Sequence, residues 1–318
     1  MEVCAKGMVM KFFTKAAILF CVIFMESGAV LHAQDAFPYP VIPDSVKNVE
    51  GRLSFLVRHY WDRFDFADTS LLKRNIAEQG LSNFLDILPR TDSSSAKDGI
   101  ALFVSRFVCG SKGSEEAKLT EEYFVGKIEQ YLYDFRSPMR DDSLYISFLR
   151  EISSSPLTGV FERGHYLYII ENLMKNRVGE VAADFAFRDR NGIIRHLGDF
   201  AGKNLVLFFY DPDCNSCHGD IERMVRSKSF MNSGAVVLAI YPGAESERWE
   251  KGNILGGVKD LLNSGIQRVE FVDGCSVGGE ILTKDIYFIR ELPSVYIIDK
   301  RGRVVLKECS VADVVSYF

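Results

Sequence analysis

The sequence predicts two domains of different class, a mostly α-helical N-terminal domain followed by an α/β domain. Apolar residues recur at three- and four-residue steps over residues 45–175, whereas after about residue 178 they gather in short β-branched and aromatic runs separated by Gly and Asp. The length of 318 residues also suits two domains of about 150 residues each. The expected boundaries are 1–33 for a signal peptide, 34–177 for the helical domain and 178–318 for the α/β domain.

The composition of the chain excludes several classes of protein. Hydrophobic residues make up 47% of the chain, which excludes wholesale disorder. The 43 acidic residues outnumber the 38 basic ones and no long basic block occurs, so we expect no DNA or other nucleic acid as a partner. Seven cysteines are too few for a disulfide-stapled fold of this length, and any cysteine chemistry should therefore be local.

Residues 1–33 have the pattern of a secretory signal peptide. Lysines precede an uncharged apolar run, Ala16–Met25, and small residues then lead to Ala33, after which we expect cleavage. A retained membrane anchor would need about 20 apolar residues, and Glu26 interrupts this run. The pattern therefore predicts export of a soluble, secreted protein.

The expected helical domain opens with an extended, proline-rich stretch at residues 37–43. Helical periodicity follows at residues 53–64, 81–88, 100–107, 124–132, 144–149 and 166–173, with polar breaks at 91–95 and 153–156. The cluster His59-Tyr60-Trp61-Asp62 contains groups that could bind a ligand, but we interpret it as an amphipathic helix with Tyr60 and Trp61 in the core and Asp62 in solvent. Cys109 and His165 are interpreted as isolated structural residues, and no catalytic motif is predicted in this half.

The C-terminal half follows the order β-α-β-α-β-β of an α/β sheet. Residues 189–192 form a hairpin-type turn between two short runs. Continuous apolar runs at 205–210 and 236–241 predict a central parallel pair of strands that is buried on both faces. The remaining expected elements are helices at 220–230 and 246–262, a strand at 269–272, and a terminal hairpin of 294–298 and 304–307.

The chemical signal is the CxxC motif Cys214-Asn215-Ser216-Cys217, which follows the first buried strand and opens the next helix. Two intervening residues let the sulfurs meet across the first helical turn. The N-terminus of a helix has unpaired N–H groups and a positive partial charge, which favour thiolate over thiol. We therefore predict a redox-active disulfide in which Cys214 is the exposed attacking thiol and Cys217 the deeper, resolving thiol.

The segments around this motif resemble the thioredoxin-like superfamily, particularly secreted bacterial thiol-disulfide oxidoreductases of the TlpA/ResA type. The resemblance covers about residues 178–310, with matches at Val178–Phe185, Asp199–Lys203, Cys214–Cys217 and Glu291–Asp299. It implies a thioredoxin-like α/β fold with a central mixed sheet flanked by helices. It also implies a cis-proline at Pro293, which would face the dithiol and help to bind the substrate chain through its backbone.

The N-terminal half resembles a domain of unknown function found beside thioredoxin-like domains in exported proteins of Gram-negative bacteria, through Tyr39-Pro40 and residues 59–66. Together the two resemblances imply a periplasmic oxidoreductase that exchanges disulfides with protein thiols and needs no cofactor or metal. A membrane thiol reductase is the expected electron donor if the dithiol works as a reductant.

Some positions depart from the family's pattern. Members usually have Trp before the first cysteine and Pro between the two cysteines, where this chain has Asp213 and Asn215-Ser216. Phe208 occupies the place of a buried carboxylate in thioredoxins proper. A like charge nearby raises the pKa of a cysteine, so Asp213 is expected to oppose formation of the Cys214 thiolate. We therefore expect a slow or partner-specific exchange.

Other interpretations of the same cysteines stay open. With His218, the motif also reads C-x-x-C-H, the attachment motif of a c-type haem. Cys275 and Cys309 could complete a zinc site, pair with each other, or remain buried free thiols. Finally, the dithiol could be a static disulfide on a non-catalytic interaction or scaffold protein.

Overall fold

The computed structural model describes residues 36–109, 114–155, 158–263 and 268–318. The expected signal peptide, residues 1–33, lies outside this part. Residues Phe37–Phe318 belong to one compact unit. In the ranges just given, no helix combines the length and apolar character that crossing a membrane requires.

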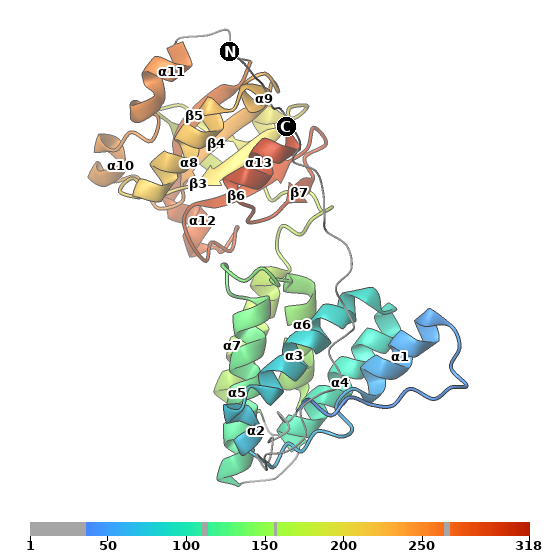
Figure 1. Cartoon of the computed structure of the whole chain (residues 1–318). Helices are drawn as coiled ribbons and strands as arrows, with labels where there is room; N and C mark the ends of the chain where they lie inside the picture. Colours follow the sequence, from blue (N-terminus) through green and yellow to red (C-terminus); the bar gives the residue numbers. More distant parts are fainter. Residues whose placement is uncertain (1–35, 110–113, 156–157, 264–267) are drawn as a thin grey trace, which may run out of the picture. The chain divides into compact units, whose positions relative to one another are not determined.

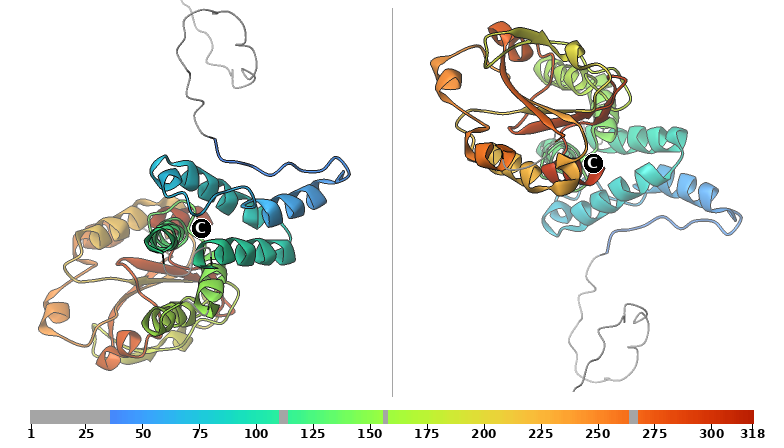
Figure 2. Two further views of the ribbon diagram at one scale, coloured as in Figure 1. Left: turned by 90° about the horizontal axis from the view of Figure 1, so that it is seen from below. Right: turned by 90° about the horizontal axis from the view of Figure 1, so that it is seen from above.

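The N-terminal half is helical, as its periodicity predicts (Figures 1 and 2, blue to light green). Its described elements are α1 (Val49–His59), α2 (Ser70–Lys73), α3 (Ile76–Ile87), the 3₁₀ turn η1 (Leu88–Arg90), α4 (Ser93–Cys109), α5 (Glu115–Leu132), α6 (Asp142–Ser154) and α7 (Val160–Leu173). The polar stretch 91–95 is not a simple break, because it contains the start of α4. Asp92 accepts hydrogen bonds from the backbone N–H groups of Ser94 and Ser95, at 3.1 and 2.9 Å, and so satisfies free donors at that helix end.

An aromatic cluster fills the centre of these helices. Tyr60 and Trp61, directly after α1, are 1% and 4% exposed, whereas the side chain of Asp62 is 41% exposed. Phe37, from the proline-rich stretch, stacks on Tyr60 with ring centroids 5.0 Å apart. Gly80 of α3 makes room for this ring, since a Cβ there would lie 2.2 Å from it. The 59–62 cluster therefore serves the core, as we interpreted it.

The C-terminal half is built on a mixed sheet. The strands described there are β1 (Ala186–Asp189), β2 (Ile194–His196), β3 (Leu205–Phe209), β4 (Val236–Tyr241), β5 (Glu270–Ser276), β6 (Ser294–Ile298) and β7 (Val304–Leu306), in the spatial order β2-β1-β5-β4-β3-β6-β7. Strands β3, β4 and β5 are parallel to one another, and the outer strands join them antiparallel. The predicted parallel pair is thus β3 and β4, with Leu205 opposite Val236.

Helices and loops cover both faces of this sheet. The remaining elements are the 3₁₀ turns η2 (Leu197–Phe200), η3 (Gly256–Val258) and η4 (Val277–Gly279), and the helices α8 (Asn215–Arg226), α9 (Lys228–Met231), α10 (Glu247–Lys251), α11 (Lys259–Asn263), α12 (Glu280–Thr283) and α13 (Val311–Tyr317). Phe208 belongs to one core with Ile221 of α8 and Val314 of α13. Phe209 belongs to the opposite core with Ile281 of α12. Because β3 has an apolar layer on each side, its apolar run is continuous.

Two expected helices differ in extent. The helix predicted at 246–262 is divided into α10, η3 and α11, because the chain is extended at Gly252, where a Cβ would lie 2.8 Å from Pro212. The helix with periodicity at 220–230 opens at the CxxC motif, as predicted, but stops before Ser227, whose side chain accepts a hydrogen bond from the backbone of α9. Helices α12 and α13 have no counterpart in the prediction.

Candidate active site

Strand β3 delivers the dithiol to the start of α8. All residues of β3 are buried, so the strand is anchored on both faces up to Phe209. Residues 210–213 then turn, and Cys214 becomes the N-cap of α8 with an extended backbone (φ −82°, ψ 102°). The predicted arrangement of a buried strand, a short turn and a helix that opens on the CxxC motif is therefore present.

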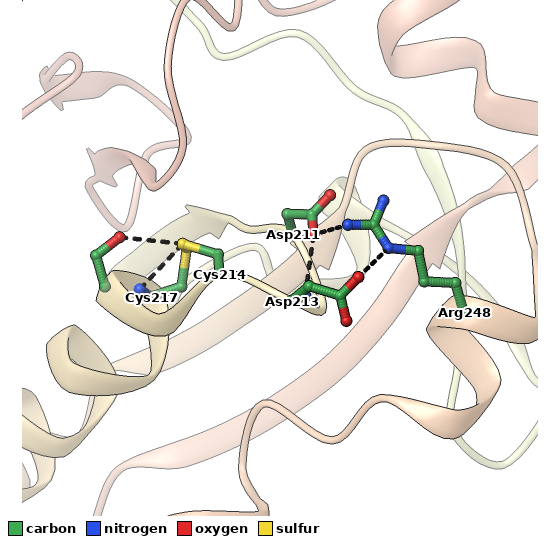
Figure 3. Close-up of a disulfide and its surroundings, with 6 residues drawn as sticks. Asp211, Asp213, Cys214, Cys217 and Arg248 are labelled. Carbon is green, nitrogen blue, oxygen red and sulfur yellow. Dashed lines mark hydrogen bonds and ion pairs between the residues drawn. A yellow bond between two sulfur atoms is a disulfide. The ribbon is translucent and has the colours of Figure 1, made fainter.

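The two sulfurs form a disulfide whose halves differ in exposure. Cys214 and Cys217 have Cα atoms 5.3 Å apart and are bonded through sulfur (Figure 3). Cys217 is fully buried against the core between α8 and the sheet, whereas Cys214 is half-buried. An incoming thiol or thiolate can therefore reach the sulfur of Cys214 and not that of Cys217.

Hydrogen-bond donors converge on the sulfur of Cys214. The backbone N–H of Cys217 donates to it at 3.1 Å, in the position of a helix cap. The hydroxyl oxygen of Ser216 also lies 3.1 Å from it. After reduction, both groups could donate to a thiolate at this place, where the N-terminus of α8 adds its positive partial charge. The geometry thus favours ionisation of Cys214.

The charge of Asp213 is offset by a partner that the sequence did not reveal. Arg248 of α10 forms ion pairs with both Asp213 and Asp211, the carboxylates just before Cys214 (Figure 3). The hydrogen bond to Asp213 is the main reason that the pKa of Arg248 is raised, so the guanidinium stays charged. Our expectation that Asp213 opposes the thiolate treated its charge as unbalanced. In the structure, one positive charge is shared by the two carboxylates.

Pro293 lies at the same end of the sheet as the dithiol. The Leu292–Pro293 peptide bond is cis, and Pro293 is half-buried directly before β6. Strand β6 pairs antiparallel with β3, and Ser294 lies opposite Phe209. This register brings Pro293 level with the turn that carries Cys214. Its role in substrate binding stays a prediction.

A buried polar network behind this turn was not predicted. Tyr210 donates a hydrogen bond to Asp273 of β5 at 2.7 Å, and Arg190 donates to the other carboxylate oxygen at 2.7 Å. The guanidinium of Arg190 also lies over the ring of Trp249 in α10, 4.1 Å from its centroid. Burial raises the pKa of Asp273, although these hydrogen bonds favour its ionised form. These contacts hold α10, and with it Arg248, beside the turn that carries Cys214.

Asp220 is a further residue that the sequence reasoning missed. It lies one helical turn after Cys217 on α8, and its side chain is 14% exposed and paired with Arg223 at 2.9 Å. Burial raises the pKa of this carboxyl group, and the charge of Arg223 acts in the opposite direction. Because residues three apart are neighbours on a helix, Asp220 lies beside Cys217 on α8. The spacing from Cys217 is the signal that could have identified it.

The other cysteines take no part in this site. Cys275 is a buried free thiol in β5 and Cys309 a half-buried free thiol after β7, so they do not pair with each other. Burial raises the pKa of each thiol to about 12. The side chain of Cys109 is outside the described part of the chain. Among the described residues, no group of three or more His, Cys, Asp or Glu side chains is arranged to hold a metal ion. The burial of Cys217, a residue of α8, against the sheet also argues against attachment of a haem to the motif.

Comparison with known proteins agrees with this architecture. A family model described as "Domain of unknown function (DUF5106)" matches residues 13–176. None of the curated proteins matches the chain significantly. The crystal structure of a thioredoxin-like protein from Bacteroides caccae superposes with a TM-score of 0.70 at 28% identity, over 88% of this chain and 97% of that one.

Two other solved structures match less than half of this chain. A conserved protein of unknown function from Bacteroides fragilis is 30% identical, and the match covers 44% of this chain and 98% of that one, with a TM-score of 0.37. The thioredoxin domain of a thiol-disulfide oxidoreductase from Bacteroides vulgatus is 19% identical, with coverages of 44% and 94% and a TM-score of 0.36. The strand order, the helices on both faces and the long match to the Bacteroides caccae protein confirm the predicted fold class. The chain belongs to the family of the domain of unknown function DUF5106, and its C-terminal half is a thioredoxin-like domain.

Proposed function

We propose that this protein is an exported thiol-disulfide oxidoreductase that exchanges disulfides with partner proteins through Cys214 and Cys217. The observation that carries the proposal is the unequal exposure of the two sulfurs at the N-terminus of α8, with two hydrogen-bond donors directed at the outer one. A half-exposed, stabilised thiolate beside a buried thiol is what an attacking and a resolving cysteine require.

The exchange begins with the reduced dithiol. The Cys214 thiolate attacks one sulfur of a partner's disulfide, whose S–S bond breaks as a mixed disulfide forms, and the partner's other sulfur leaves as a thiolate and takes up a proton. Cys217 then loses its proton, for which we propose Asp220 on α8 as the acceptor, and attacks the sulfur of Cys214. The second partner thiol is released. Two electrons have then passed to the partner, and the Cys214–Cys217 disulfide has formed.

Pro293 completes the proposed site. Its backbone lies level with the turn that carries Cys214 and would bind the extended substrate chain next to the substrate's reacting cysteine. A polypeptide bound in this way places its disulfide in line with the Cys214 sulfur, which is the orientation that the exchange needs.

The cellular setting is also part of the proposal. The pattern of residues 1–33 favours export to the periplasm of a Gram-negative-type envelope. A dithiol that reduces partners there becomes oxidised after each cycle. It therefore needs a thiol donor, for which a membrane thiol reductase is the candidate.

Reduction of insulin disulfides tests the proposal. We expect the wild-type protein to reduce insulin with dithiothreitol as donor, and the Cys214→Ser variant to lose at least about a hundredfold of this rate. Cys275→Ser serves as a control that should keep the rate. Equal rates for wild type and Cys214→Ser would contradict the proposal and favour a scaffold role.

A further inference from the structure

A cavity of about 700 Å³ opens beside the segment that leads to Pro293. One wall comes from α5 and the loop after it, with Glu129, Asp134, Phe135 and Arg136. The other wall comes from Phe288 and Glu291, shortly before the proline. The helical domain therefore supplies half of a cavity whose other half belongs to the proposed substrate-binding segment.

This cavity is held in shape by buried charges. The side chain of Arg290 is 9% exposed and forms an ion pair with Glu308, which is 2% exposed. Arg290 also donates to the backbone carbonyl of Tyr133 at 3.0 Å and lies over the Tyr133 ring, 4.5 Å from its centroid. A further contact joins it to Asp142 at 3.4 Å. Because its charge is already matched by carboxylates, Arg290 positions the wall and is not available to bind an acidic ligand.

The charges that remain in the cavity are mainly negative. Glu129 and Asp134 are exposed, and in the described part of the chain neither forms an ion pair. Glu291 lies 3.8 Å from Arg136, whose side chain is 83% exposed. The rings of Phe135 and Phe288 add apolar surface to these carboxylates. Carboxylates next to aromatic rings suit a guanidinium, which can form an ion pair and stack at the same place.

The cavity is also within reach of the reacting sulfur. Glu291 and Pro293 are two residues apart, so their Cα atoms lie within about 8 Å of each other. Pro293 is level with the turn that carries Cys214, as the pairing of Ser294 with Phe209 requires. An extended peptide spans about 3.4 Å per residue, so a few residues connect a cysteine at Cys214 with a side chain in the cavity.

From these contacts we propose that the cavity binds the substrate polypeptide next to its reacting cysteine, and that it selects segments with Arg or Lys there. This inference rests on the proposed exchange activity and adds the class of substrate. The helical domain then acts as the specificity element of the thioredoxin-like domain.

Peptide disulfides test the selectivity. The substrates are three nine-residue peptides, each with one central cysteine that is joined to glutathione by a disulfide. The two residues that flank this cysteine are arginines in one peptide, glutamines in the second and glutamates in the third. At low salt, we expect kcat/KM for the arginine peptide to exceed that for the glutamine peptide about tenfold, with the glutamate peptide slowest, since each exposed ion pair contributes about threefold. The double variant Glu129→Gln/Asp134→Asn should reduce the arginine preference to about twofold or less.

The control is Glu122→Gln, seven residues before Glu129 on the same helix and therefore on the same helical side. It removes one carboxylate charge outside the cavity, half of the charge that the double variant removes, and should leave the preference unchanged. Equal rates for the three peptides with wild type, or an arginine preference that survives the double variant, would overturn the inference.

A binding measurement separates this inference from the exchange reaction. A fluorescent arginine peptide with Ser in place of Cys should bind the Cys214→Ser protein about tenfold more tightly than its glutamine counterpart, as measured by anisotropy, and the double variant should abolish the difference. If wild type reduces no peptide while this binding difference is present, the exchange function fails and the charged docking site stands. If the glutamine peptide is reduced normally but no binding difference is found, the docking site fails and the exchange function stands.

Discussion

Ser216→Ala tests the stabilisation of the attacking sulfur. The Ser216 hydroxyl is one of two groups 3.1 Å from the Cys214 sulfur, the other being the backbone N–H of Cys217. A hydrogen bond to an ionised group contributes about 1.5–3 kcal/mol. At a half-exposed sulfur we take a value just below this range, about 1.4 kcal/mol, which is a factor of ten in an equilibrium constant. At pH values well below the pKa of Cys214, the thiolate fraction of the reduced variant should therefore fall about tenfold.

The assay is the rate of alkylation of Cys214 by iodoacetamide between pH 5 and pH 9, followed by mass spectrometry of the reduced protein. The midpoint of the rate against pH should move up by about one unit in Ser216→Ala. Asn215→Ala is the control, because this side chain is exposed in the same turn and makes no hydrogen bond to the sulfur. A Ser216→Ala profile that coincides with that of wild type would refute the reasoning.

Three further predictions concern the buried ion pair of Arg290, the charge of Arg248 and the two free thiols. Arg290→Met leaves the buried carboxylate of Glu308 without its main partner and should lower the free energy of unfolding, measured by urea denaturation, by about 3 kcal/mol. An unchanged urea midpoint would show that this ion pair does not stabilise the cavity wall. Arg248→Gln removes the positive charge that offsets the carboxylates of Asp211 and Asp213. It should slow alkylation of Cys214 at pH 7 about threefold at low salt, and the difference from wild type should disappear in 1 M salt. A difference that persists in 1 M salt would contradict this electrostatic explanation. Burial raises the pKa of the Cys275 and Cys309 thiols to about 12, so at pH 8 both should resist alkylation in the folded protein and react only in denaturant. Rapid labelling of either in the folded protein would contradict these raised pKa values.

Local features of the sequence predicted most of the fold. Continuous apolar runs identified β3 and β4 because a strand with an apolar layer on both faces has no polar positions. The CxxC motif was placed correctly because two parallel strands need a crossover between them, usually a helix, and the motif lies at the start of that crossover. These signals lie within about ten consecutive residues.

The contacts that complete the site join distant positions. Arg248 is 35 residues from Asp213, and nothing in either local sequence indicates that they meet. Arg290 and Glu308 are both charged, and a charged residue is normally expected at the surface, yet they pair in the interior. Gly252, where α10 ends, lies so close to Pro212 that a side chain would not fit, which only the folded chain reveals. Pairing partners and packing neighbours thus had to come from the structure.

The reduction potential of the Cys214–Cys217 pair tests the central claim most directly. Equilibration of the protein with glutathione or dithiothreitol buffers, followed by trapping of free thiols, gives this potential. A pair that exchanges electrons with partners should have a potential above about −300 mV, in the range of catalytic dithiols. A potential well below that value would mark a structural disulfide that cellular reductants do not open, and would contradict the account.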